Sequence, residues 1–236
     1  MVINVYMIFD FFESKRNEIA AGQLRRPHGI LAKRVGNVMN KTNRFIHDFT
    51  IQTLKLEDGE RVLEIGFGNG KFFNDVFKVA KKLHVSGLEC SSQMVKGAKR
   101  KNAETVKSGK LDLVCGDSGK MPFKDNTFDK IYCVNVIYFW DLPSIHLKEV
   151  LRVLKPGGKF YAGFRAKEFF SLIPLTEYGF NIYDQQDWRT QLELNGLKFF
   201  LSSRIIEPEM LIYGKTYRLY SYCVVGQKPI QNKDGV

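Results

Sequence analysis

The feature that most constrains the fold is a glycine-rich turn at residues 66–70, which directly follows a short apolar strand. The expected strand reads Arg-Val-Leu-Glu-Ile and the turn reads Gly-Phe-Gly-Asn-Gly. Apolar residues then recur at helical spacing: Phe72, Phe73, Val76, Phe77 and Ala80. Glycine lets the backbone turn sharply and approach a ligand closely, and the helix that follows offers free N–H groups. This order predicts a ligand site at the carboxyl end of a parallel sheet.

The chain continues to alternate between predicted strands and helices. Further strands are expected at 84–89, 110–117, 128–135 and 159–165, and one helix, capped by Ser91 or Ser92, is expected over 91–107. This alternation predicts a parallel sheet with helices on both faces. A helix near 184–194 and strands near 197–206 and 218–225 then predict a closing antiparallel hairpin. The expected fold class is α/β, a doubly wound, seven-stranded, mostly parallel sheet with an antiparallel C-terminal hairpin.

Two segments have the length and composition to cover the ligand edge of this sheet. Residues 1–55 contain no predicted strand and are expected to form an N-terminal helical cap. Residues 166–184 are apolar and aromatic with little charge, and they predict a cap or substrate insertion within a domain that spans 56–228. The connection between the last two strands is expected to be too short to contribute. Residues 229–236 are expected to be a flexible tail.

Composition excludes several classes of protein. With 44% hydrophobic and 26% charged residues over 236 residues, the chain is neither disordered nor collagen-like nor a coiled coil. No stretch approaches the roughly 18 apolar residues that a membrane span needs. Residues 2–12 lack the marks of a secretory signal, so a cytoplasmic protein with reduced thiols is expected. The four cysteines form no Cys-x-x-Cys pair, and no metal site is predicted.

The net charge of +11 is concentrated in one part of the chain. Residues 78–110 carry nine Lys and Arg against two Asp and Glu. A basic face can bind nucleic acid. However, basic residues such as Lys96, Lys99 and Arg100 are also typical of the solvated side of a helix, so nucleic acid is not the expected partner.

The next acidic position narrows the type of ligand. Glu89 ends the strand after the turn, 21 residues beyond Gly68, and is placed to accept hydrogen bonds from two ribose hydroxyls. A dinucleotide-binding turn would have a third glycine where Lys71 stands, and no phosphate-loop motif occurs. The pattern favours an adenosine-containing cofactor over NAD or FAD.

Four motifs follow one another in a specific order. They are Val-Leu-Glu-Ile-Gly-Phe-Gly-Asn-Gly at 62–70, Gly-Leu-Glu at 87–89, Gly-Asp-Ser at 116–118, and Leu-Arg-Val-Leu-Lys-Pro-Gly-Gly at 151–158. Over residues 60–165 the chain resembles the class I S-adenosylmethionine-dependent methyltransferases. It is most similar to their type-11 group, which acts mostly on small molecules such as quinones and sterols. The resemblance implies a Rossmann-like methyltransferase fold with S-adenosyl-L-methionine as cofactor.

The resemblance also assigns a set of residues to the cofactor: Glu64, Gly66, Gly68, Gly70, Glu89, Met94, Asp117, Ser118 and Asn135. The glycines would leave room for its amino-acid part, and Glu64 would engage its ammonium group. Glu89 would bind the ribose, and Asp117 with the backbone after it would bind adenine. Met94 would pack on the adenine or belong to the core. Asn135 would lie near the methionine part.

The acceptor and the catalytic residue are less constrained. Methyl transfer needs a general base only when the nucleophile arrives protonated. Candidates are Tyr138 and, if the N-terminal helices close over the site, His28 and His47. Asn135 and Tyr138 resemble the Asn-Pro-Pro-Tyr motif of methyltransferases that act on adenine or glutamine amides. Both prolines are missing, which argues against such targets.

The expected partner is therefore a small-molecule acceptor, apolar or aromatic. Asn37, Asn40 and Asn43 recur every three residues and are spaced to face one site. An RNA or protein methyltransferase, or a non-catalytic protein that binds S-adenosylmethionine, are the alternatives. The sequence does not indicate the oligomeric state.

Overall fold

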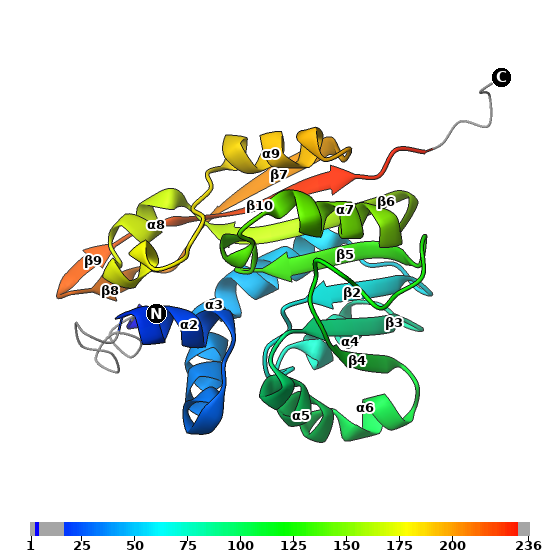
Figure 1. Cartoon of the computed structure of the whole chain (residues 1–236), viewed down its shortest axis with the longest axis horizontal. Coiled ribbons are helices and arrows are strands. Elements are labelled where there is room, and N and C mark those ends of the chain that lie inside the picture. The colour runs from blue at the N-terminus through cyan, green and yellow to red at the C-terminus, as the bar shows by residue number, and fades with distance from the viewer. Residues whose placement is uncertain (1–2, 5–16, 231–236) are drawn as a thin grey trace.

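The computed structural model describes residues 3–4 and 17–230, which form a twisted seven-stranded sheet with helices on both faces (Figure 1). Its strands are β2 (Arg61–Ile65), β3 (His84–Glu89), β4 (Leu111–Cys115), β5 (Phe128–Val134), β6 (Leu154–Arg165), β7 (Lys198–Ile206) and β10 (Tyr220–Gln227). Their order is β4-β3-β2-β5-β6-β10-β7, and within this sheet only β10 runs antiparallel to its neighbours. The predicted fold class, with its antiparallel closing hairpin, is confirmed.

Helices cover the two faces because strand residues alternate between two apolar cores. Val62 of β2 belongs to one core and Leu63 to the other, as the two-residue period of a strand requires. The first core is covered by α3 (Ala32–Leu54), α4 (Phe73–Val79) and α5 (Ser92–Lys101), and the second by α7 (Pro143–Val153) and α9 (Gln185–Leu194). Among the described residues, no helix is long and apolar enough to cross a membrane.

The remaining elements are short. They are α2 (Asn17–Arg25), η2 (Gly29–Leu31), α6 (Ala103–Lys107), η3 (Ile137–Phe139), α8 (Lys167–Ser171) and η4 (Pro174–Glu177), with β1 (Ile3–Asn4), β8 (Met210–Ile212) and β9 (Lys215–Tyr217). Figure 1 shows α2, α8 and η4 near the ends at which the parallel strands finish, and α2 contacts η4. Segments from opposite ends of the chain therefore meet at one edge of the sheet.

Two predictions about strands outside the main sheet are wrong. The first 55 residues do contain a strand, because β1 pairs in parallel with β8. The connection between β7 and β10 is not a simple loop, because β8 and β9 pair as an antiparallel hairpin within it. Gly214 and Tyr213 both take positive φ at the tip, which a tight hairpin turn requires and which is unusual for tyrosine. The rest of the expected flexible tail, residues 231–236, lies outside the described residues.

Two boundaries also differ from the sequence prediction. The single helix expected over 91–107 is divided into α5 and α6 at Asn102, whose buried side chain donates to the carbonyls of Gly70 and Ala98. Ser91, as predicted, caps α5. β6 begins at Leu154 rather than Lys159, and its pairing with β5 is irregular near Pro156 and Gly157, where a missing N–H and a φ of 78° interrupt the ladder.

Candidate functional site

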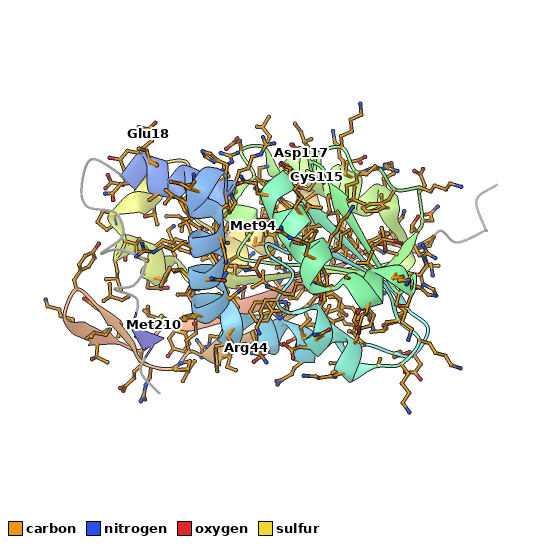
Figure 2. The ribbon with its side chains drawn as sticks, turned by 90° about the horizontal axis from the view of Figure 1, so that it is seen from below. Glu18, Arg44, Met94, Cys115, Asp117 and Met210 are labelled. Carbon is orange, nitrogen blue, oxygen red and sulfur yellow. The ribbon has the colours of Figure 1, made fainter. Side chains whose placement is uncertain are left out.

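A cavity of about 750 Å³ lies at the carboxyl ends of β2, β3 and β5, where Ile65, Glu89 and Val134 contribute to its lining. Its other walls come from α3, from residues 24–27, and from the loops that follow β4 and β5. Parallel sheets bind ligands at this edge, and cofactor sites have volumes in this range. Figure 2 shows α3 beside Met94 of α5, with Asp117 toward the same edge of the molecule as Glu18 of α2.

The three glycines of the turn all have positive φ, but their surroundings differ. A Cβ on Gly66 would lie 2.4 Å from Val136, and one on Gly70 would lie 2.7 Å from Ala98, so both are needed for close packing. A Cβ on Gly68, at φ 57°, would meet nothing within 4 Å, because it would point into open space. Gly66 and Gly68 line the cavity, whereas Gly70 packs against α5 and does not line it.

Glu89 is the acid nearest to this turn. Its side chain is buried, and its two oxygens accept hydrogen bonds from the backbone N–H groups of Gly68 and Ser91, both at 2.9 Å. Burial raises the pKa of this carboxyl, and the two backbone hydrogen bonds partly oppose that shift. The carboxylate is therefore held in one orientation at the cavity wall before any ligand arrives.

The loop after β4 presents Asp117 and Ser118 to the cavity. The Asp117 side chain is exposed, and its Oδ1 accepts a hydrogen bond from the Gly119 N–H at 2.6 Å. Ser118 Oγ lies 2.8 Å from His146 Nδ1, and His146 stacks on Trp140 with ring centroids 4.7 Å apart. Burial lowers the pKa of His146. Sequence reasoning missed His146, because one histidine on an amphipathic helix carries no signal by itself.

Glu64 and His47 form a second buried polar group in the same cavity. Tyr132 donates a hydrogen bond to Glu64 Oε2 at 2.7 Å, while His47 Nε2 lies 3.4 Å from Glu64 Oε1. His47 is 2% exposed, neither of its ring nitrogens has a hydrogen bond within the described residues, and its ring stacks on Phe72 at 4.2 Å. A buried imidazole without a partner is costly. It therefore offers a polar contact to a ligand.

Asn135 directly follows β5 and has the left-handed conformation, with φ 55°. The backbone N–H of Arg165 donates to the Tyr138 hydroxyl at 2.7 Å, and that hydroxyl donates to Asn135 Oδ1 at 2.6 Å. Asn135 Nδ2 in turn donates to Asn43 Oδ1 at 3.1 Å. Burial raises the pKa of Tyr138 well above its usual range, so this hydroxyl acts as a fixed link between β6 and Asn135.

Four predicted site residues do not line this cavity: Gly70, His28, Met94 and Tyr138. His28 is exposed and hydrogen-bonds through its ring to the Arg26 carbonyl. Met94 is buried under α3, where a Cβ on Gly36 would lie 3.0 Å from its methyl group. Of the three regularly spaced asparagines, Asn40 and Asn43 line the cavity, whereas Asn37 is exposed and outside it.

A second, apolar pocket of about 80 Å³ adjoins the large cavity. It lies between α3, η3 and the segment 169–180, and its apolar walls include Phe169, Phe170 and Ile173. Five residues line both spaces: Leu24, Met39, Asn43, Asn135 and Phe139. The large cavity therefore continues into an apolar extension.

Residues 24–27 line the large cavity and contact residues on two of its walls. Arg25 forms an ion pair with Asp141, and its carbonyl accepts a contact from Cys90 Sγ at 3.5 Å. The Pro27 carbonyl accepts a hydrogen bond from Ser91 Oγ at 2.5 Å. These contacts attach the segment to the loops after β3 and β5.

Comparison with known proteins agrees with this geometry. A family model described as "Methyltransferase domain" matches residues 63–162. The chain is 32% identical over 124 residues to an uncharacterized methyltransferase, YdaC, of Bacillus subtilis, covering 52% of this chain and 66% of that protein. It is 31% identical over 153 residues to a demethylmenaquinone methyltransferase of Symbiobacterium thermophilum, covering 62% of this chain and 56% of that protein. The chain thus spans less than two thirds of either relative.

A solved structure extends the fold likeness over nearly the whole chain. It is the methyltransferase in a complex with the Trm112 methyltransferase activator of Haloferax volcanii. The TM-score is 0.71 at 19% identity, and the match covers 90% of this chain and 97% of that chain. At this identity the likeness establishes the fold alone.

Proposed function

The chain belongs to the type-11 group of class I S-adenosylmethionine-dependent methyltransferases, and from this premise we propose that it methylates an apolar or aromatic small molecule. The observation that carries the proposal is the continuity of two spaces. A cavity of cofactor size ends in an apolar pocket, and the two share five lining residues. A methyl donor in the first space would face an acceptor in the second.

Each side of the large cavity suits one part of S-adenosylmethionine. The fixed carboxylate of Glu89 would accept hydrogen bonds from the ribose hydroxyls, and the loop at Asp117 and Ser118 would hold adenine. Glu64, with His47 beside it, would bind the charged amino-acid part. The open space at Gly68 would receive the cofactor where a side chain would exclude it.

The cofactor supplies the electrophile, so positioning and exclusion of water can account for most of the rate. We assign no general base. Tyr138 is committed to Asn135 and Arg165, and His28 is outside the cavity. His47 lies next to Glu64, on the amino-acid side of the proposed cofactor position.

The proposed cap is built from residues 1–55 and 166–184 over a methyltransferase domain at 56–228. Contacts between α2 and η4, and the shared lining by Leu24 and Phe170, support it. The apolar pocket would then be the acceptor side of the active site. The curated relative that acts on demethylmenaquinone is consistent with an apolar acceptor.

Calorimetric titration tests the cofactor assignment. S-adenosylmethionine and its demethylated product should bind, whereas NAD should not. Gly68→Val should abolish binding, because the side chain would occupy cofactor space. Gly109→Val is the matched control, since Gly109 also has positive φ, at 72°, and open space around its Cβ, yet lies outside the cavity. Tight NAD binding with no response to S-adenosylmethionine would overturn the proposal.

A further inference from the structure

The junction between the two cavities contains two polar side chains, Asn43 and Asn135. The other residues that line both spaces are Leu24, Met39 and Phe139, which offer no polar side-chain atom other than a thioether. Under the proposed function, the reacting atom of the acceptor must lie at this junction. The hydrogen-bonding character of these two amides therefore decides which acceptor atom can be held there.

The orientation of both amides follows from a chain of hydrogen bonds. The Arg165 backbone N–H can only donate, so the Tyr138 hydroxyl accepts from it and gives its own proton to Asn135 Oδ1. The other end of that amide, Asn135 Nδ2, then donates to Asn43 Oδ1. Arg165 Nη1 approaches the same oxygen at 3.4 Å, and a guanidinium has only donors. Asn43 must therefore present its Nδ2 elsewhere.

Asn43 Nδ2 has no hydrogen-bond acceptor among residues 3–4 and 17–230, and the side chain is half-buried in the wall of both cavities. The other polar groups of the apolar pocket are already engaged. Thr42 and Thr176 donate to carbonyls of their own segments. Arg165 is paired with Glu207 at 2.8 Å. The junction thus offers the Asn43 Nδ2 group as a donor, while the oxygens of both amides already accept hydrogen bonds from other side chains.

A site of this kind discriminates between ligand atoms that accept a hydrogen bond and ligand atoms that donate one. It suits an atom with free lone pairs better than the N–H or O–H of a protonated nucleophile, because the unengaged side of the Asn43 amide carries only donors. Hydrogen bonds to a charged acceptor are stronger than those to a neutral one. The pocket volume, about 80 Å³, is roughly half of a cavity that holds one benzene ring, so it admits a ring edge.

We propose that Asn43 Nδ2 binds the ionised oxygen of a phenol or enol whose ring edge enters the apolar pocket. The inference rests on the proposed function and names its acceptor class. An electron pair of the oxyanion forms the new O–CH₃ bond while the S–CH₃ bond breaks and its electron pair stays on sulfur. The negative charge of the acceptor and the positive charge of the sulfonium disappear together. No proton is transferred, which agrees with the absence of a free base at the junction.

The test uses 4-nitrophenol, whose visible absorption distinguishes its ionised form, with the full chain saturated by S-adenosylhomocysteine. The complex should bind the ionised form about tenfold more tightly than the neutral form, because a hydrogen bond to a charged group is the stronger one. 4-Nitroaniline, which has the same shape but presents N–H donors, should bind about tenfold more weakly than the phenol. Equal binding of the amine and the phenol would overturn the inference.

Variants at Asn43 separate its amide from the shape of the pocket. Asn43→Asp keeps the oxygen that faces Asn135 and Arg165 but replaces Nδ2 by a second oxygen, so the preference for the ionised phenol should be lost. Asn43→Leu should also lose the preference for the ionised phenol, without adding a charge. Asn37→Ala, on the exposed side of the same helix, should bind as the unchanged protein does. Circular dichroism confirms folding of each variant.

The outcomes also distinguish this inference from the function on which it rests. If S-adenosylhomocysteine itself fails to bind, the proposed function is wrong, and the inference with it. If it binds, but both Asn43 variants retain the preference for the ionised phenol, only the acceptor assignment is wrong.

Discussion

The two sides of the proposed active-site cavity, a proposed cofactor side and a proposed acceptor side, are built in different ways. On the cofactor side, Gly68 and Glu89 are 21 positions apart, and a strand end and a backbone N–H join them directly. On the acceptor side, Asn135 and Arg165 meet through the pairing of β5 with β6, and Asn43 reaches them through the packing of α3 on the sheet. The cofactor side depends on local turns, and the acceptor side depends on tertiary contacts.

Because of this difference, we expect substitutions on the two sides to have unequal effects on ligand binding and on stability. A substitution of an exposed residue on the proposed cofactor side, such as Asp117, should alter ligand binding with little effect on folding. Where the polar side chains are buried, as in the pair of Arg165 with Glu207, a substitution should change stability as well. The experiments below test this contrast, beginning with the largest expected effect.

Removing the charge of Glu207 should have the largest effect. Its side chain is fully buried, it pairs with Arg165, and it accepts a hydrogen bond from Ser221. Glu207→Gln leaves the buried guanidinium without its counter-charge, so the free energy of unfolding should fall by about 3–5 kcal/mol. Urea titration measures it. Glu209→Gln, two positions away in an exposed pair with Arg218, should change the free energy by less than about 1 kcal/mol. If the two variants lose the same unfolding free energy, the buried network of Glu207 does not contribute more to stability than an exposed ion pair.

Glu89→Ala should have the next largest effect, which is measured on cofactor binding. It removes the proposed charge-assisted bonds to the ribose, so S-adenosylhomocysteine should bind about 2–3 kcal/mol more weakly by calorimetry. Glu104→Ala, on α6 and outside the cavity, is the control. Unchanged affinity in the Glu89 variant would place the ribose elsewhere.

Asp117→Ala should cost less, about 1–2 kcal/mol of cofactor binding, because one hydrogen bond to adenine is lost. The side chain is exposed, so water competes for the same groups. A comparison of adenosine with inosine identifies the contact, since inosine lacks the amino group that Asp117 would bind. If the variant discriminates between the two nucleosides as the unchanged protein does, Asp117 does not read adenine.

His146 should produce the smallest effect, a weak dependence of stability on pH. Burial lowers its pKa in the folded protein, although Asp117 and Asp141 act in the opposite direction. The unfolded chain then binds more protons as the pH falls below about 6.5, so the contribution of this group to stability is lost below that pH and complete above it. His146→Phe should reduce the fall in unfolding free energy between neutral and mildly acidic pH. If the unfolding free energy of the variant falls with pH as it does in the unchanged protein, His146 is not the cause of the pH dependence.

The same contrast explains what sequence analysis could and could not predict. The parallel strands of the proposed cofactor half and the positions of Glu64, Gly68 and Glu89 at the cavity follow from short motifs, each read within one turn and its flanking strand. The division of the expected helix at Asn102 does not follow from any local motif, because it depends on a contact with Gly70, 32 positions away. The pairing of β1 with β8 joins residues over 200 positions apart, and no local pattern indicates it.

The proposed acceptor side shows most clearly what sequence analysis could not predict. Tyr138 is a candidate general base by sequence, yet its hydroxyl joins Asn135 to Arg165. Asn43 was notable only for its spacing from Asn37 and Asn40, and the orientation of its amide depends on a hydrogen-bond chain that includes residue 165. Sequence patterns identify which residues are polar, but they do not show which of their atoms are already engaged.

The segment at residues 24–27 has a consequence for the pace of turnover. Leu24 lines both the cofactor cavity and the apolar pocket, while the next three residues line the cofactor cavity and attach to Asp141 and Ser91. Moving this segment outward would open both spaces at once. Departure of the spent cofactor and admission of a new acceptor would then share one kinetic barrier, set by the detachment of Arg25 and Pro27.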